Sequence, residues 1–394
     1  MTAAVAEKPN NARNTSGSVM NPTTVEKVAG RSDEMLLNLG PQHPATHGVL
    51  RVLMGVDGER VTRAIPHIGY LHRNHEKLEE VRTYPMCIPY TDRMDYVSGM
   101  QNELPLCLAV EEMLGIEVPE RAKYVRTILF ELSRIASHMV WIGTYMLDLG
   151  AITPFLYAFR DREMILDIIE ETAGARLLPN YFTYGGIRRD HHPRMMQDIL
   201  EFLTWFEKKL PEYEALTIDA PVFQARTVGV GVLDPQVALN HGVTGPNLRG
   251  SGIGWDLRKD DPYDAYPQMD FEVCVEYGCD AYSRSRARYR EFRESIKIIR
   301  QAIAMCPKGG AYLPKLPRLK PVAGMERYRA VEISRGHLGV HIVADGSEKP
   351  WRSKHRSPSF CTLQALADMA VGSKFSDAIA ILGSIDIVLG EIDR

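Results

Sequence analysis

Residues 120–149 constrain the fold of this chain more than any other segment. Apolar side chains recur there at helical spacing, at Val125, Ile128, Leu129, Leu132, Ile135, Met139, Ile142 and Met146. The pattern predicts one helix of about seven or eight turns. Because much of its surface is apolar, we expect this helix to run through the centre of the protein, with other elements packed around it.

The rest of the chain adds further helices and short strands. Helical patterns cover residues 98–114, which end before Gly115, and 155–178, 194–210, 283–305, 359–369 and 377–382. Short apolar runs predict strands at 35–39, 49–54, 60–65, 328–334 and 339–344, with Asp57-Gly58 and Asp345-Gly346 as hairpin turns. The predicted class is α+β and mostly α: a central bundle of long helices with small peripheral antiparallel sheets.

Composition along the chain predicts one large domain behind a tail. Residues 1–34 are expected to form a flexible N-terminal tail, because apolar side chains do not recur at helical or strand spacing in residues 1–30. Residues 35–394 are expected to form the domain. Its parts are a β-rich lobe at 35–97, a helical bundle at 98–217, and a loop-rich and C-terminal α/β part at 218–394.

Several functional classes are excluded by the sequence. The net charge of -3 gives no reason to expect nucleic acid binding. The longest apolar run, 378–390, is too short to span a membrane and contains Asp386. No Gly-rich dinucleotide motif opens a helix after a strand, so we expect no NADH bound by this chain. The six cysteines form no CxxC pair, which argues against a metal cluster or zinc site held by this chain alone.

A proline- and glycine-rich loop at 40–48 carries His43 and His47. Their spacing of four suits a metal pair on a helix, but Pro44 and the flanking glycines forbid a regular helix here, so we reject a zinc site. Two interpretations remain. Either the histidines satisfy backbone groups of the loop, or the loop tip points imidazole donors into a cavity.

The segment 90–98 is dense in polar side chains just before a helix. An ordinary capped helix start, with Asp95 or Ser98 as N-cap, explains one or two of them. It does not explain Arg93, two aspartates and two tyrosines together.

The long helix has one polar stripe, formed by Glu131, Arg134 and His138. If the helix is central, these groups must be paired, and we favour an internal salt bridge between Glu131 and Arg134. Asp148, near the helix end, is compatible with either a solvated or a buried position. The arginines between 284 and 293 predict a solvated helix face or a docking surface for an acidic neighbour.

These segments, taken together and in order, resemble the 49 kDa subunit family of respiratory complex I. The matching motifs are 40–51, 66–73, 92–96, 131–138, 148–151, 154–155 and 390–394, so the resemblance covers essentially residues 35–394. It implies a fold like that of the [NiFe]-hydrogenase large subunit, to which the family is related.

The hydrogenase metal ligands are replaced in this chain. Hydrogenases carry a first R-x-C-x-x-C, where this chain has Arg93, with Asp95 and Ser98 at the cysteine positions. Their closing D-P-C-x-x-C-x-x-H corresponds to residues 386–394, with Val388, Glu391 and Arg394 in place of the ligands. Nickel and iron need soft thiolates. We therefore expect no metal bound by this chain.

The resemblance also implies roles for single residues. His47 and Tyr96 are expected to hydrogen-bond the two carbonyls of a quinone, with Asp148 as the carboxylate partner of His47. His43, Asp95 and Arg93 are expected to line or brace the quinone cavity. Arg73 and His138 are expected near a terminal iron–sulfur cluster.

The same resemblance implies that the chain is one subunit of a proton-translocating NADH:quinone oxidoreductase. It also implies that the chain binds no cofactor itself and that the [4Fe–4S] cluster belongs to a neighbouring subunit. Expected partners are that subunit, a 30 kDa-type subunit, a membrane-arm subunit and the quinone. The expected location is peripheral, on the cytoplasmic side of an inner membrane. The alternatives are a subunit of a membrane-bound hydrogenase or ferredoxin-oxidising complex, and a non-catalytic scaffold.

Overall fold

The computed structural model of the chain describes residues 26–27, 34–43 and 48–394. Its longer helices are α3 (Gly99–Leu114), α4 (Glu120–Asp148), α5 (Ile152–Ala173), α6 (Met195–Leu216), α11 (Ala281–Met305) and α14 (Phe375–Ser384). The short helices are α1 (His75–Val81), α2 (Tyr84–Thr91), α7 (Pro221–Thr227), α8 (Pro235–Asn240), α9 (Pro246–Arg249), α10 (Leu257–Asp260), the 3-10 helix η2 (Tyr266–Gln268), α12 (Pro358–Gln364), α13 (Leu366–Ala370) and α15 (Leu389–Asp393).

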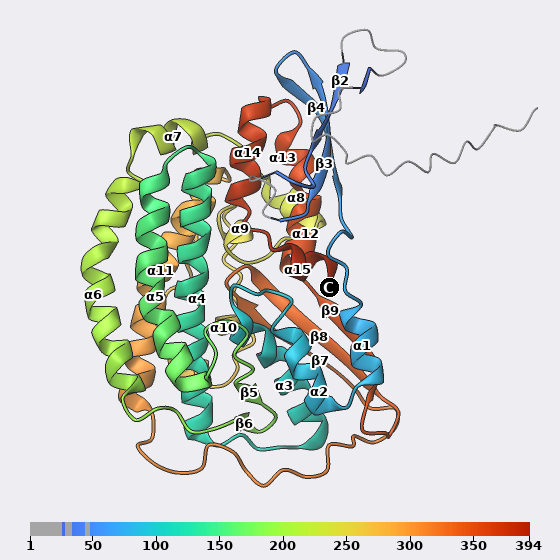
Figure 1. Cartoon of the computed structure of the whole chain (residues 1–394), viewed down its shortest axis with the longest axis vertical. Coiled ribbons are helices and arrows are strands. Elements are labelled where there is room, and N and C mark those ends of the chain that lie inside the picture. Colours follow the sequence, from blue (N-terminus) through green and yellow to red (C-terminus); the bar gives the residue numbers. More distant parts are fainter. Residues whose placement is uncertain (1–25, 28–33, 44–47) are drawn as a thin grey trace, which may run out of the picture.

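Helix α4 forms the axis of the molecule, as the sequence predicts. It stands beside α5, α6 and α11 in the bundle of Figure 1 and packs against α3, α5, α11 and α14. Every apolar position of the predicted stripe is buried, from Val125 to Met146. No helix in the described part of the chain is both long and apolar enough to cross a membrane.

Two of the helices end at a glycine, whereas a third continues through a proline. Helix α3 ends at Gly115, which takes the left-handed conformation expected of a C-terminal cap (φ 62°). Helix α5 ends at Gly174 (φ 84°) instead of continuing to 178. Helix α6 runs through Pro211 to Leu216, because the buried Tyr213 is packed into the core beyond the proline.

The N-terminal strands form an antiparallel sheet in the order β1 (Glu26–Lys27), β2 (Glu34–Leu39), β3 (Arg51–Asp57) and β4 (Arg60–His67). The predicted hairpin turn lies between Asp57 and Arg60, which are paired. Strand β4 packs on α13 and α14, so residues such as Val52 and Val61 share a core with the C-terminal helices. The backbone of 26–27, which the sequence placed in the tail, pairs with β2.

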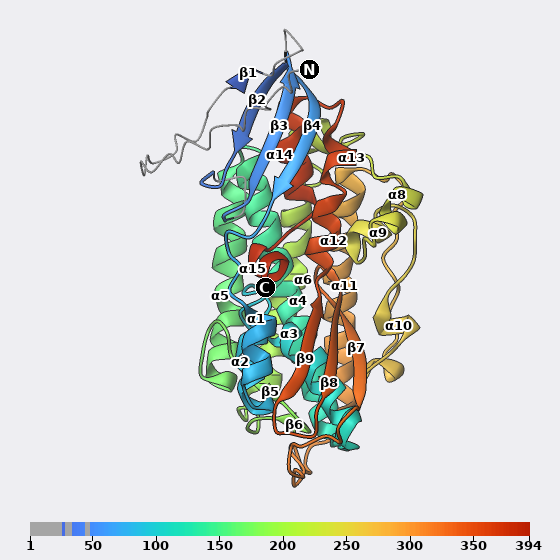
Figure 2. The same ribbon diagram turned by 90° about the vertical axis from the view of Figure 1, so that its right-hand side faces the viewer.

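A second antiparallel sheet consists of β7 (Glu326–Ile333), β8 (Gly336–Ala344) and β9 (Pro350–Arg356). It lies below the first sheet in Figure 2 and packs on α3 and α1. Strand β9 was not predicted from the sequence, because its residues are mostly polar. They face α1 instead of the core: Arg352 and Lys354 form ion pairs with Glu76. A two-stranded hairpin, β5 (Phe182–Thr183) and β6 (Gly186–Ile187), completes the sheets.

The arginine-rich face of α11 differs from the prediction. Arg284 and Arg288 are completely buried, and burial lowers the pKa of both guanidinium groups to about 10. Arg288 lies 4.7 Å from the centre of the Trp141 ring. The predicted solvated or docking face is therefore wrong for these two residues, which are four apart and point into the bundle.

Candidate functional site

The C-terminal segment accepts hydrogen bonds from the backbone of the 66–73 motif. The Asp393 carboxylate accepts from the backbone N–H of Gly69 at 2.8 Å and of Leu71 at 2.7 Å. The backbone N–H of Arg73 donates to the Arg394 carbonyl at 3.1 Å. Two motifs from opposite ends of the chain therefore form one surface, where α15 and the C-terminus lie above α1 in Figure 2.

The 92–98 motif meets both of these segments. The Arg73 guanidinium donates to the Arg93 carbonyl at 2.5 Å. At Gly390 a β-carbon would lie 2.6 Å from the Met94 carbonyl oxygen, which is closer than a side chain can approach. The site therefore depends on a glycine at this point of contact.

Asp95 is a buried anchor in the interior and no helix cap. Its carboxylate accepts from the Ser98 hydroxyl at 2.5 Å and from the Arg335 guanidinium at 2.5 Å. Ser98 does occupy the N-cap position of α3, as one of the two predicted candidates, but its side chain makes no capping hydrogen bond there. The polar density of this segment therefore reflects a buried ion pair, which the helix-start interpretation did not account for.

Arg335 joins the two regions that correspond to hydrogenase ligand positions. It lies in the turn between β7 and β8 with 2% of its surface exposed. Besides Asp95, it donates to Asp386 at 3.1 Å. Burial by itself would lower the pKa of Arg335, but the carboxylates of Asp386 and Asp95 outweigh it and raise that pKa. A fixed guanidinium charge thus occupies the space between the replaced ligands.

The residues at the four former ligand positions do not fit a nickel–iron centre. Asp95 is held by the guanidinium, Ser98 donates to Asp95, and Val388 offers no ligand atom. The carboxylate of Glu391 accepts hydrogen bonds from Ser357 and Ser359. A cation would have to displace an arginine that is already paired with two acids.

The side chain of Tyr96, an expected quinone ligand, is accessible from the surface. Its side chain is 38% exposed. Burial and the charge of Asp95 raise its pKa, and Arg335 and Arg73 oppose that shift. The crevice behind it, lined also by Ser98, has a volume of about 20 Å³, enough for about one water molecule. A larger ligand must therefore reach the phenol from its exposed side.

The loop expected to carry the two histidines is closed at its base by a bridge between His43 and Gly48. His43 is half-buried. A β-carbon on Gly48 would lie 3.3 Å from the side chain of Leu389, so the loop base borders the C-terminal segment. His47 lies outside the described residues.

Asp148 is the last residue of α4 and is half-buried, which is intermediate between the solvated and the buried environment that the sequence left open.

Arg93 is exposed, and its guanidinium donates to the Pro89 carbonyl. The Arg93 side chain therefore turns back toward α2, which contains Pro89.

His138 lies inside the bundle with no exposed surface. Its Nε2 is 2.8 Å from the Glu291 carboxylate, and burial lowers its pKa in spite of that partner. Any influence of His138 on a group outside this chain must act through space, since the buried ring cannot touch a neighbouring molecule.

The predicted salt bridge between Glu131 and Arg134 is confirmed at 3.1 Å.

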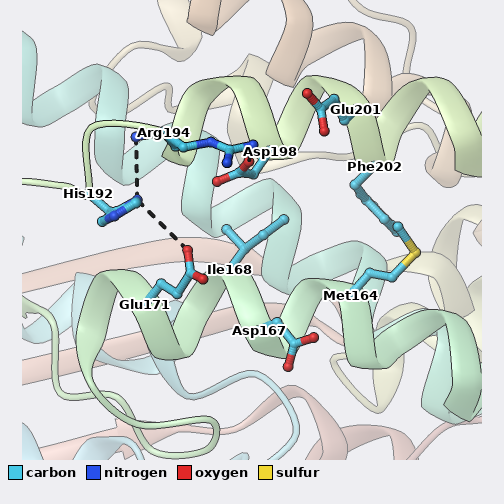
Figure 3. Close-up of a pocket in the computed structure, with 9 residues that line it drawn as sticks. All are labelled: Met164, Asp167, Ile168, Glu171, His192, Arg194, Asp198, Glu201 and Phe202. Atoms are coloured by element: carbon cyan, nitrogen blue, oxygen red, sulfur yellow. Dashed lines mark hydrogen bonds and ion pairs between the residues drawn. The ribbon is translucent and has the colours of Figure 1, made fainter.

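A cluster outside the motifs lies between α5 and α6, in a pocket of about 410 Å³ (Figure 3). Ligand-type atoms of Glu171, His192 and Asp198 approach within 4.8 Å of one another. Arg194 already pairs with Asp198 at 3.1 Å, and its backbone N–H donates to His192 Nδ1 at 3.3 Å. Because these atoms are engaged by Arg194, we assign no metal to the pocket.

Arg335 is the main site residue that sequence reasoning missed. A charged residue in a hairpin turn usually points to solvent, so its position gave no signal. The signal lay elsewhere: Asp95, at a position that corresponds to a metal ligand, and Asp386 are acids that need a cation beside them when they are buried. These acids predict a buried arginine or lysine without saying which one.

Known proteins are similar in sequence to this chain over most of its length. The family described as "Respiratory-chain NADH dehydrogenase, 49 Kd subunit" matches residues 148–321 and 316–394. The D subunit of the NADH-quinone oxidoreductase of Geobacillus thermodenitrificans is 48% identical over 363 residues, which are 92% of this chain and 99% of that protein. The D subunits of the same enzyme from Geobacillus kaustophilus and Bacillus cereus are 48% and 46% identical, with the same coverage of each chain.

Proposed function

The chain belongs to the 49 kDa subunit family of respiratory-chain NADH dehydrogenase, and we propose that it forms the site at which that enzyme reduces quinone. The similar D subunits carry NADH-quinone oxidoreductase in their names. The proposal places the quinone headgroup at the meeting point of the segments 66–73, 92–98 and 386–394, next to the loop closed by His43 and Gly48.

The observation that carries the proposal is the environment of Tyr96. A phenol with a raised pKa is protonated at neutral pH and can donate both a hydrogen bond and a proton. Two cations, Arg335 and Arg73, act on it through space. They favour the phenolate that remains after a proton has left.

This environment suits the chemistry of quinone reduction. Each carbonyl oxygen gains negative charge as the quinone takes up two electrons, and a donor placed where that charge develops stabilises the reduced state. The Tyr96 O–H bond then breaks, the proton forms a new O–H bond on the quinone, and the electron pair stays on the tyrosine oxygen. Arg335 and Arg73 stabilise that anion until it is reprotonated.

His47 and Asp148 are proposed to serve the second carbonyl. A carboxylate beside an imidazole favours the protonated ring and fixes its tautomer. Asp148 is suited to this role because it ends α4 in a half-buried position. His43, Asp95 and Arg93 are proposed to brace the cavity, and Asp95 does so through its bond to Arg335.

We propose that electrons arrive from a [4Fe–4S] cluster held by a neighbouring subunit, and that this chain holds no cofactor. Arg73 is proposed to act on that cluster as a nearby positive charge, whereas the buried His138 would act only through space. The further partners are a 30 kDa-type subunit and a membrane-arm subunit, on the cytoplasmic side of an inner membrane. Coupling to proton translocation belongs to the same proposal.

A hydrogenase-type function is opposed by the paired guanidinium of Arg335 between the former ligand positions. A purely structural role remains as the alternative, and one experiment separates it from quinone binding. The assembled enzyme is labelled with a photoreactive quinone analogue, and the modified peptides are mapped. We expect label in residues 40–51, 92–98 or 386–394, and we expect excess quinone to suppress it. Competed label on other subunits alone would leave this chain as a scaffold.

A further inference from the structure

Five buried charged groups meet behind Tyr96 and come from separate parts of the chain. They are Asp95 of the 92–98 motif, Arg288 of α11, Arg335 of the β7–β8 turn, Asp386 after α14, and Glu391 of α15. None has more than a few per cent of its surface exposed. Buried charges are stable only when they are paired, so the pairing within this group determines its protonation.

Four of the five groups balance one another. Arg335 pairs with Asp95 at 2.5 Å and with Asp386 at 3.1 Å. Arg288 lies 3.8 Å from the other oxygen of Asp386. Two arginines therefore face two aspartates, and their formal charges cancel.

Glu391 is the group left over. Its side chain is completely buried, and no ion pair joins it to a cation in the described part of the chain. The charged groups around it are Asp95, Arg335 and, next to Gly390, Arg73. Its own segment adds Asp386, Asp393 and Arg394. A buried carboxyl without its own counter-ion favours the protonated form.

The charges and hydrogen bonds around Glu391 bring its pKa close to neutral pH. Burial and the negative charge of Asp95 raise the pKa of Glu391 to about 7, against the opposing effects of Arg335 and of hydrogen bonds from Ser359 and Ser357. The group is therefore protonated below about pH 7 and ionised above it. Small changes in the charge of the neighbouring groups can move Glu391 from one form to the other.

The hydrogen bonds identify the atom that holds the proton. Oε1 of Glu391 accepts from the Ser359 backbone N–H at 2.9 Å, a group that can only donate, and from the Ser357 hydroxyl at 2.7 Å. Oε2 faces the Ser359 hydroxyl at 3.1 Å, and a hydroxyl can also accept. The proton therefore belongs on Oε2, directed at Ser359.

We propose that Glu391 is a positioning residue for the proposed quinone site: by holding or releasing a proton, it sets how strongly the Arg335 guanidinium supports proton donation by Tyr96. This inference rests on the proposed function of Tyr96. With Glu391 neutral, the guanidinium is opposed by Asp95 and Asp386. With Glu391 ionised, a third carboxylate opposes it, so a tyrosinate at Tyr96 is less stable and the phenol donates its proton less readily. Glu391 itself transfers no proton to quinone in this scheme.

The first test is spectroscopic and independent of quinone. An infrared difference spectrum of the assembled enzyme between pH 6 and pH 8 should contain the carbonyl stretch of a protonated carboxylic acid, with a midpoint at about pH 7. Glu391→Gln should remove this band. As a matched control, Glu79→Gln removes another completely buried glutamate, which bonds Ser353 and His355, and should retain the band.

The second test is the pH profile of quinone reduction. The wild-type rate should fall about tenfold as Glu391 ionises, a change of about 1.4 kcal/mol in the activation free energy. Glu391→Gln imitates the neutral form and should stay active, within about twofold, from pH 6 to pH 8. Glu79→Gln should keep the wild-type profile. Ser357→Ala removes a hydrogen bond that lowers the pKa of Glu391, so it should move the wild-type inflection to higher pH.

The two proposals fail in different ways. A band that persists in Glu391→Gln, or an unchanged inflection in that variant and in Ser357→Ala, overturns the role of Glu391 and leaves the quinone site intact. If Glu391→Gln does not assemble, the Ser357→Ala shift decides the matter. A quinone rate that does not depend on the Tyr96 hydroxyl overturns the proposed function, whatever the infrared band does.

Discussion

Arg335 gives the proposed site its electrostatic character at the residue scale. One guanidinium ties Asp95, from the N-terminal third of the chain, to Asp386, near its end. Removing it would leave two buried carboxylates without a counter-ion, and breaking a buried pair in this way typically costs about 3–5 kcal/mol. The same charge acts on Tyr96, so structure and chemistry depend on one side chain.

A second residue-scale question is whether Asp148 acts through His47. Asp148→Asn keeps the shape of the side chain but removes the charge that favours protonated imidazole. We expect its effect on quinone reduction to resemble that of His47→Ala, and the double variant to lose little more than either single one. The coupling should fall within about 0.5–3 kcal/mol, measured from the three rates in a double-mutant cycle. Clean additivity would show that the two residues work separately.

At the scale of elements, the site is a contact between segments that have little structure of their own. Helix α15 is only five residues long, and it is held by its contacts with α12 and with the 66–73 and 92–98 motifs. The contact with the 92–98 motif is tightest at Gly390.

Gly390→Ala should therefore damage quinone reduction. The added β-carbon meets the Met94 carbonyl at 2.6 Å and the Arg93 carbonyl at 3.1 Å, so the two segments must separate. Overpacking of this kind typically costs about 1–3 kcal/mol. Quinone reduction by the assembled enzyme should fall, while Gly309→Ala, where no atom lies within 4 Å, should behave as wild type. Equal rates in the two variants would show that the contact is not needed.

The sequence predicts the elements that bury an apolar face. Helix α4 and the β3–β4 hairpin were predicted because their periodicity is set by burial alone. Strand β9 was missed because it forms ion pairs with α1 along a polar edge. Helix α15 was missed because short helices are specified by what they contact.

At the scale of the whole molecule, the fold separates the proposed chemistry from the bulk of the core. The bundle around α4 and the two sheets meet along the line where the C-terminal segment lies (Figures 1 and 2). The motifs along this line were found in the sequence by resemblance, and the structure brings three of them, 66–73, 92–98 and 390–394, into contact. The sequence did not identify Arg335 as the ion-pair partner of Asp95 and Asp386, because it is distant in sequence from both acids.

The central claim, that quinone is reduced at Tyr96, is tested most directly by Tyr96→Phe in the assembled enzyme. The substitution keeps the ring and removes only the donor hydroxyl. Loss of one donor to an oxygen that develops charge typically lowers the rate by about two to three orders of magnitude. We predict that quinone reduction falls by this amount while NADH:ferricyanide activity, which bypasses the site, persists. Reduction of short-chain quinones by Tyr96→Phe at the wild-type rate and apparent affinity would contradict the account.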